Sequence, residues 1–214
     1  MTATVPALLD TITRKRLGKL AALDDVALAV QLLRNVPTNE NRSDTELAQH
    51  AGRALDYGAG LADDHDRADA PATVTERTGG IQDRVLARYN SRSDQVDLYV
   101  DTILFCDSLI DEMGWRHWYP AGSVRQAAID HEHAHHLVTR NHARELRRAL
   151  DHDAFRVGRW RRLAFIAGAD EVAAHAFASA NASVGRSFLL LTAAASAALS
   201  TRRSASRPST PSEN

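Results

Sequence analysis

Two histidines and a glutamate in the stretch AAIDHEHAHHLVT, residues 127–139, have the types and the spacing to do chemistry. His131, Glu132 and His135 form the pattern H-E-x-x-H. On a helix, histidines four residues apart lie one turn apart on the same face, so both imidazoles can reach one metal ion. Glu132 lies at the adjacent edge, where it can take a proton from a metal-bound water. The pattern predicts a zinc hydrolase, and the alternative is a solvated, histidine-rich helix face.

A catalytic zinc ion needs a third protein ligand. The extended pattern H-E-x-x-H-x-x-G-x-x-H does not supply it, because Asn141 stands where its third histidine would be. The favoured ligand is Glu171, on a later predicted helix. Ala174 and Ala178 follow it on the same helix face, and small residues there let this helix approach the zinc helix closely.

Other residues near Glu171 compete for a role in the site. His175, one turn later, is the second candidate for the third ligand, or else a donor to the oxyanion, and Tyr119 is another candidate donor. Asp170 and His152 remain further options for the third ligand. A carboxylate in a first turn is also favoured by the helix dipole alone, which accounts for Glu171 but not for the alanines after it.

The elements that must position these residues can be predicted from periodicity. Ser123 and Gln126 form the capping box S-x-x-Q, which predicts a helix from there through the H-E-x-x-H motif. Residues 85–89 and 96–100 alternate apolar and polar side chains around a turn-rich segment, which predicts a β-hairpin. Residues 73–76 are the candidate third strand, because a two-stranded hairpin alone would be marginally stable.

The rest of the chain reads mainly as helix. Residues 1–70 are predicted to form a helical N-terminal appendage, with one helix ended by Gly58-Ala59-Gly60 and an acidic linker after it. Residues 71–200 would form the zinc domain. Within it, residues 140–162 are read as a basic helix and residues 170–199 as an alanine-rich helix broken near Gly185. Residues 201–214 are rich in serine and proline, which predicts a disordered tail.

The fold class predicted from these elements is α+β and mainly helical, with a small hairpin or sheet packed on a zinc-binding helix. The 214-residue chain has a net charge of −1 and 44% hydrophobic residues, so neither a nucleic acid nor a membrane is expected as a partner. Its longest apolar stretch, Phe188–Leu199, is shorter than the roughly 20 residues of a membrane span. The single cysteine, Cys106, lies in an apolar run, which predicts a buried thiol and a reducing, cytoplasmic location.

The order H-E-x-x-H and then E-x-x-A-x-x-F-A resembles the ImmA/IrrE-type minimal zinc peptidases, within the gluzincin class. The resemblance covers about residues 75–180, and the matching residues are His131, Glu132, His135, Glu171, Ala174, Phe177 and Ala178. It implies a compact α+β fold in which the edge strand of a small sheet can pair with an extended peptide. Members of that family often cleave a transcriptional repressor or act in the regulation of phages and mobile elements.

The sequence therefore predicts a peptidase in which Zn²⁺ is held by His131, His135 and Glu171. Glu132 would be the general base and His175 a second catalytic residue. The predicted strand over residues 95–101 would align a peptide or protein substrate by β-augmentation. The rival hypothesis is a non-catalytic regulatory or protein-interaction module on the same scaffold. A zinc hydrolase of a non-peptide amide is a third option, and the sequence does not predict the oligomeric state.

Overall fold

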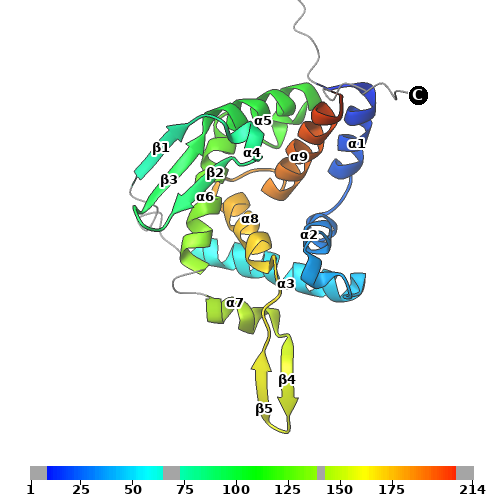
Figure 1. The fold of residues 1–214 in the computed structure, drawn as a ribbon, viewed down its shortest axis with the longest axis vertical. Coiled ribbons are helices and arrows are strands. Elements are labelled where there is room, and N and C mark those ends of the chain that lie inside the picture. The colour runs from blue at the N-terminus through cyan, green and yellow to red at the C-terminus, as the bar shows by residue number, and fades with distance from the viewer. Residues whose placement is uncertain (1–8, 65–72, 139–142, 206–214) are drawn as a thin grey trace, which may run out of the picture.

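A computed structural model describes residues 9–64, 73–138 and 143–205, and it confirms the predicted α+β, mainly helical class (Figure 1). The first half of the chain forms α1 (Thr11–Ala21), α2 (Asp25–Arg34), η1 (Pro37–Asn39), α3 (Asp44–Asp64), β1 (Thr73–Arg77), α4 (Gly80–Asp83), β2 (Ala87–Asn90) and β3 (Gln95–Tyr99). The second half forms α5 (Val100–Met113), η3 (Trp115–His117), α6 (Ser123–Leu137), α7 (Ala143–Leu150), β4 (Asp153–Val157), β5 (Trp160–Leu163), α8 (Ala169–Asn181) and α9 (Phe188–Ala205).

Helix α3 continues through residues 58–60, where the sequence predicted its end. Gly58 packs so closely on α8 that a Cβ atom would lie 2.1 Å from the carbonyl oxygen of Ala173. The glycine therefore serves a contact between helices and not a helix terminus. Ala51 of α3 and Phe177 of α8 belong to the same core. The N-terminal helices are thus packed into the core around α8, while the predicted boundary at residue 70 lies outside the described residues.

Strands β1, β3 and β2 form one sheet in that order, with β1 parallel and β2 antiparallel to β3. The predicted hairpin and the predicted third strand are both present. Because β3 lies between the other two strands, both of its edges are already paired. The prediction that residues 95–101 align a substrate strand is therefore wrong, since β-augmentation needs a free edge. Val100 and Asp101 moreover begin α5.

Only part of the predicted basic helix over residues 140–162 is helical. After α7, strands β4 and β5 form a hairpin that projects from the body of the molecule (Figure 1). Phe155, Val157 and Trp160 are 58% to 73% exposed on it, so these apolar side chains do not pack into the core. Gly158 supplies the left-handed backbone of the turn, with φ 57°. The two-residue period of this segment was the missed signal.

Helices α8 and α9 account for the predicted alanine-rich helix and its break. Gly185 lies between them, and Gly168, with φ 84°, precedes α8. Helix α9 extends to Ala205, so part of the predicted tail is helical and the remainder lies outside the described residues. Of the helices described, none combines the length and the apolar character that crossing a membrane requires.

Candidate metal centre

Helix α6 carries the H-E-x-x-H motif as predicted, but its start differs from the prediction. The N-cap is Gly122, in the left-handed region with φ 82°, and the hydroxyl of Ser123 donates to the carbonyl of Pro120. The predicted capping box is therefore not formed. The helix still places His131 and His135 one turn apart, with 3.1 Å between their Nε2 atoms. Both imidazoles thus direct the same nitrogen to one point.

Glu171, in the first turn of α8, closes this group from the facing helix. Its Oε1 lies 3.2 Å from Nε2 of His131, and its Oε2 lies 3.0 Å from Nε2 of His135. Around a tetrahedral zinc ion with bonds of 2.0–2.1 Å, neighbouring ligand atoms are roughly 3.3 Å apart. The three side chains are therefore spaced like ligands of one ion, and they could hold a metal. We call His131, His135 and Glu171 the α6–α8 group.

Small side chains allow the two helices to come this close. Ala174 and Ala178, one and two turns after Glu171, are fully buried, and so is Ala134 on α6. Helices α6 and α8 pack against each other along this contact. A glutamate side chain is short, so it reaches two imidazoles on a neighbouring helix only where the two backbones approach closely. The packing role predicted for Ala174 and Ala178 is confirmed.

His175 contacts the α6–α8 group from the protein interior. The residue is 3% exposed, and its Nε2 lies 3.4 Å from Oε1 of Glu171. Its ring centroid lies 4.4 Å from that of His131. It therefore stands behind the carboxylate and beside the imidazole. Asp170, the other nearby candidate for third ligand, is not part of the α6–α8 group.

The charges of the group favour an ionised carboxylate. Burial would raise the pKa of Glu171, but hydrogen bonds from the three histidines around it outweigh burial and hold that pKa well below its usual range. Burial and the nearby His175 lower the pKa of His131. Burial also opposes charge on His135, yet its hydrogen bond with Glu171 prevails and its pKa is raised. Ionised carboxylate and neutral imidazole are the forms that bind metals, so metal binding competes with protonation of His135.

Glu132 lies beside the α6–α8 group, against the sheet. Its Oε2 accepts a hydrogen bond of 2.8 Å from the backbone N–H of Tyr89 on β2. The backbone N–H of Tyr99 donates to the carbonyl of Leu86, so the backbone groups of Ala87 and Tyr89 face away from β3. The carboxylate is therefore held at the outer edge of β2. No local sequence pattern could reveal this contact, because residues 89 and 132 are distant in the chain.

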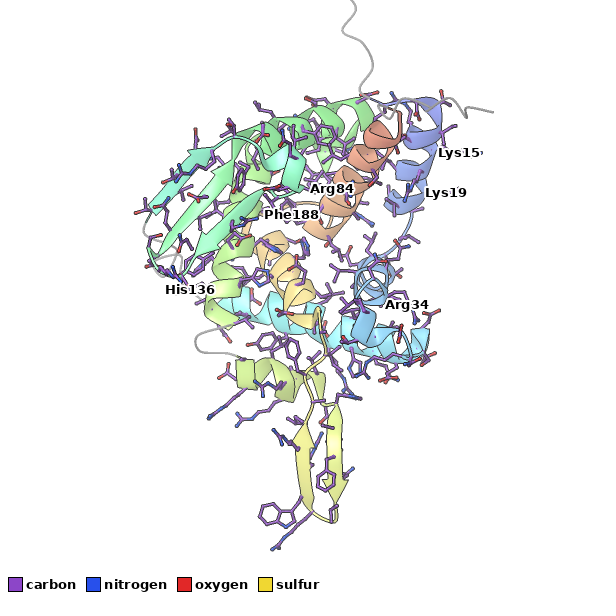
Figure 2. All side chains as sticks on the ribbon, viewed as in Figure 1. Lys15, Lys19, Arg34, Arg84, His136 and Phe188 are labelled. Atoms are coloured by element: carbon purple, nitrogen blue, oxygen red, sulfur yellow. The ribbon has the colours of Figure 1, made fainter. Side chains whose placement is uncertain are left out.

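The other histidines of α6 serve packing. His133 is buried, with its ring centroid 5.7 Å from that of Phe177. His136 lies against β2, with its ring centroid 4.8 Å from that of Tyr89 (Figure 2). Tyr119 is fully buried and donates its hydroxyl hydrogen to a backbone carbonyl, so its predicted role as an oxyanion donor is wrong.

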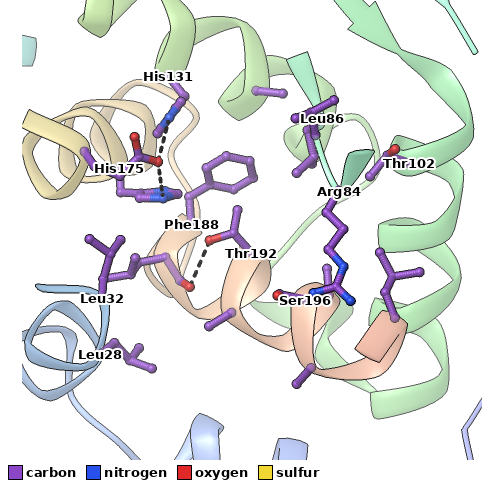
Figure 3. A pocket seen from close by; sticks show the side chains of 18 of the residues that line it. Leu28, Leu32, Arg84, Leu86, Thr102, His131, His175, Phe188, Thr192 and Ser196 are labelled. Carbon is purple, nitrogen blue, oxygen red and sulfur yellow. Dashed lines mark hydrogen bonds and ion pairs between the residues drawn. The ribbon is translucent and has the colours of Figure 1, made fainter. Parts of the chain in front are cut away.

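The α6–α8 group opens onto a cavity of about 480 Å³. His131 and His175 lie on one side of it, and Leu86 and Arg84 lie across from them (Figure 3). Phe188, at the start of α9, contributes a ring whose centroid is 5.7 Å from that of His175. Leucines of α2 complete the wall, so helices of the N-terminal region help to shape the cavity. The sequence did not predict this contribution.

A second set of potential metal ligands consists of Glu46, His50 and His152, here called the α3 group. The predicted alternative role of His152 as third ligand of the H-E-x-x-H site is therefore wrong, because its side chain lies with α3. The sequence signal that was overlooked is the spacing of Glu46 and His50, four residues apart on one helix face.

Comparisons with protein-family models, with curated proteins and with solved structures found no match.

Proposed function

We propose that this chain is a zinc-dependent peptidase that uses the α6–α8 group as its metal centre. The observation that carries the proposal is the convergence of two imidazole Nε2 atoms and one carboxylate, 3.0–3.2 Å apart, beside a further glutamate and a cavity. The resemblance of the H-E-x-x-H and E-x-x-A-x-x-F-A patterns to ImmA/IrrE-type peptidases supports the same assignment.

The chemistry of the donor set favours zinc. Two imidazoles and one carboxylate are the ligands of known catalytic zinc sites that keep a fourth position open. Calcium and magnesium prefer oxygen ligands alone, and thiolate-dependent metals lack a partner here because Cys106 is fully buried away from the group. Zinc, when bound in such a site, supplies a water of lowered pKa and polarises a carbonyl oxygen.

Glu132 is the proposed general base. Its carboxylate is oriented by the N–H of Tyr89 through one oxygen, Oε2, at the edge of the α6–α8 group. It would accept the proton of the attacking water and then pass it to the leaving amine, which is the usual sequence of proton transfers in peptide hydrolysis. His175 contacts Glu171 and would orient that carboxylate, so we assign it a positioning role in place of the predicted catalytic role.

The peptide substrate would lie along β2. The outward-facing backbone of Ala87 adjoins the cavity, and an extended peptide could pair with it by β-augmentation. The substrate is thus assigned to an edge strand in place of β3. Of the two edge strands, β1 and β2, it is β2 that borders the cavity. A side chain of such a peptide would then enter the cavity beside the metal centre.

The test combines zinc content with peptide hydrolysis. Purified protein should contain zinc, cleave an unstructured substrate such as casein, lose this activity on chelation and regain it when zinc is restored. Glu132→Gln should keep its zinc and lose turnover by about 10²–10⁴-fold, because only the proton acceptor is removed.

The matched control is Glu76→Gln, which changes an exposed glutamate of β1 that pairs with Arg125. It should hydrolyse casein at the wild-type rate. Zinc-loaded wild type without hydrolysis would favour the non-catalytic module, and full activity in Glu132→Gln would remove that residue from the mechanism.

A further inference from the structure

The α3 group lies on a different part of the molecule from the proposed metal centre. Glu46 and His50 are one turn apart on α3, and His152 stands between α7 and β4. One possible ligand atom from each of these side chains lies within 4.8 Å of the other two. The rings of His50 and His152 meet edge to face, with centroids 4.9 Å apart. The proposed peptidase mechanism uses none of these residues.

His50 is an unsatisfied polar group in the core. The residue is 4% exposed, and neither of its ring nitrogens has a hydrogen-bond partner among the described residues. Its Nε2 lies 3.7 Å from Oε1 of Glu46, which is too far for a hydrogen bond. Buried polar atoms are nearly always satisfied, so an orphaned imidazole directed at a carboxylate and a second imidazole calls for an additional partner.

The charges around His50 keep it in the form that binds metals. Burial, then the neighbouring His152 and Arg42, hold the pKa of His50 below its ordinary value, against the effect of Glu46. Arg53, from the next turn of α3, acts in the same direction as Arg42. The imidazole is therefore neutral, with a lone pair available on one nitrogen.

Arg42 already brings a positive charge to this place. Its NH1 donates to Oε1 of Glu46 and also lies 3.2 Å from Nε2 of His152. Because a guanidinium can only donate, Nε2 of His152 must present its lone pair toward it. The lone pairs of Glu46 and His152 thus converge on the guanidinium of Arg42, while the ring nitrogens of His50 have no such cationic partner among the described residues.

We propose that Glu46, His50 and His152 form a second metal site, for a zinc-like divalent ion. In the metal-free protein the guanidinium of Arg42 occupies part of this site. Two imidazoles and a carboxylate suit such an ion. Arg42 is displaced when the metal binds, because the two cations compete for the same oxygen of Glu46. This competition makes the α3 group a weaker site than the α6–α8 group.

A metal here would fasten the projecting hairpin to the core. The carbonyl of His152 accepts a hydrogen bond of 2.7 Å from the N–H of Ala164, which closes the base of the β4–β5 hairpin. Glu46 and His50 belong to α3, which packs on α8. An ion shared by these residues therefore links the position of the hairpin to the helix that carries Glu171.

The test is a count of zinc ions by competitive titration with a chromophoric chelator, using the full chain. Wild type should bind two equivalents, with different affinities. His152→Gln should bind one equivalent, and His117→Gln, an exposed histidine elsewhere, should bind two. His131→Ala with His135→Ala should keep the weaker equivalent. Because the readout is metal bound and not hydrolysis, the α3 group can fail or succeed independently of the proposed peptidase.

Arg42→Gln provides a second test, because a gain in zinc affinity would not be expected if Arg42 only stabilised the fold. Removing the competing cation should tighten the weaker site by about tenfold, a difference of about 1.4 kcal/mol in binding free energy. A single equivalent of zinc, found in wild type and in Arg42→Gln alike and lost in the variant with His131→Ala and His135→Ala, would overturn the proposal. So would a second equivalent that persists unchanged in His152→Gln, which would place that ion elsewhere.

Discussion

The α6–α8 group and the α3 group contain the same donors, two imidazoles and one carboxylate, in different surroundings. In each group, two of the three residues lie four apart on one helix. The α6–α8 group opens onto a cavity and has Glu132 beside it, whereas Arg42 hydrogen-bonds to the carboxylate of the α3 group. Donor types set which ions can bind, and the neighbouring residues decide what a bound ion could do.

Exposure of the donors does not separate the groups, because each has one buried and two partly exposed members. The side chains of His135 and Glu171 are 27% and 39% exposed, so solvent can reach that group. In the α3 group the side chains of His50 and Glu46 are 5% and 34% exposed, and His152 stands at the base of the hairpin. A hydrolase needs an open coordination position, while a site that ties elements together does not. The cavity and Glu132 beside the α6–α8 group therefore favour chemistry there, whereas the hairpin base beside the α3 group favours a structural role.

The largest expected difference between the groups comes from replacing each carboxylate by an amide. Glu171→Gln should lower peptide hydrolysis by on the order of 10²-fold or more, because a carboxamide is a poor zinc ligand and the metal-assisted reaction is lost. Glu46→Gln should leave kcat unchanged. Initial rates at saturating zinc measure both. Equal losses in the two variants would abolish the functional distinction between the groups.

Replacing His175 and replacing Arg42 should change zinc affinity in opposite directions at their respective groups. His175→Gln removes an imidazole that orients Glu171, and loss of such a supporting residue typically weakens metal binding by about 10–100-fold. Arg42→Gln is expected to strengthen binding at the α3 group. Zinc titration of both variants measures the pair of effects. Unchanged affinity in His175→Gln would mean that Glu171 is oriented by the helices alone.

The contact between α3 and α8 underlies both groups, and two glycines of α3 test it. Gly58→Ala would force a methyl group into the backbone of Ala173, so we expect a loss of roughly 1–3 kcal/mol in unfolding free energy. Gly52→Ala meets open space on the same helix and should gain up to about 1 kcal/mol from helix propensity. Urea unfolding measures both. An unchanged free energy of unfolding in Gly58→Ala would show that α3 and α8 can move apart without loss of stability.

The smallest effect expected is a pH dependence of stability in chelated, metal-free protein. Burial lowers the pKa of His50, so the unfolded chain takes up a proton near the ordinary value of 6.5 before the folded chain does. Neutral His50 therefore makes its full contribution to the free energy of unfolding above pH 6.5. This contribution is lost as the pH falls toward the lower pKa that His50 has in the folded protein. His131 adds to this slope, and His135, whose pKa is raised, opposes it.

Urea unfolding at several pH values between about 7.5 and 5.5 should show a shallower fall of stability in His50→Gln than in wild type. His117→Gln, which removes an exposed histidine, serves as the control and should follow wild type. Parallel curves for wild type and His50→Gln would indicate that the imidazole of His50 is hydrated in solution.

Local spacing was enough to predict much of the α6–α8 group. The i, i+4 geometry of a helix fixes the relation between His131 and His135 whatever the rest of the chain does. The alanines after Glu171 likewise indicated a close helix pair, because their small side chains recur on one helix face. The apolar alternation around residues 90–94 predicted the β2–β3 hairpin for the same reason, because strand and helix periods are properties of the local chain.

The tertiary structure alone decided what joins distant segments. From the sequence alone, Gly58 indicated the end of a helix. In the structure it lies inside α3, at the point where α8 packs against that helix. The order of strands makes β3 central and leaves β2 to hold Glu132 through Tyr89. The α3 group unites residues about a hundred positions apart. Such contacts depend on how elements pack in space, and periodicity along the chain carries no information about which faces meet.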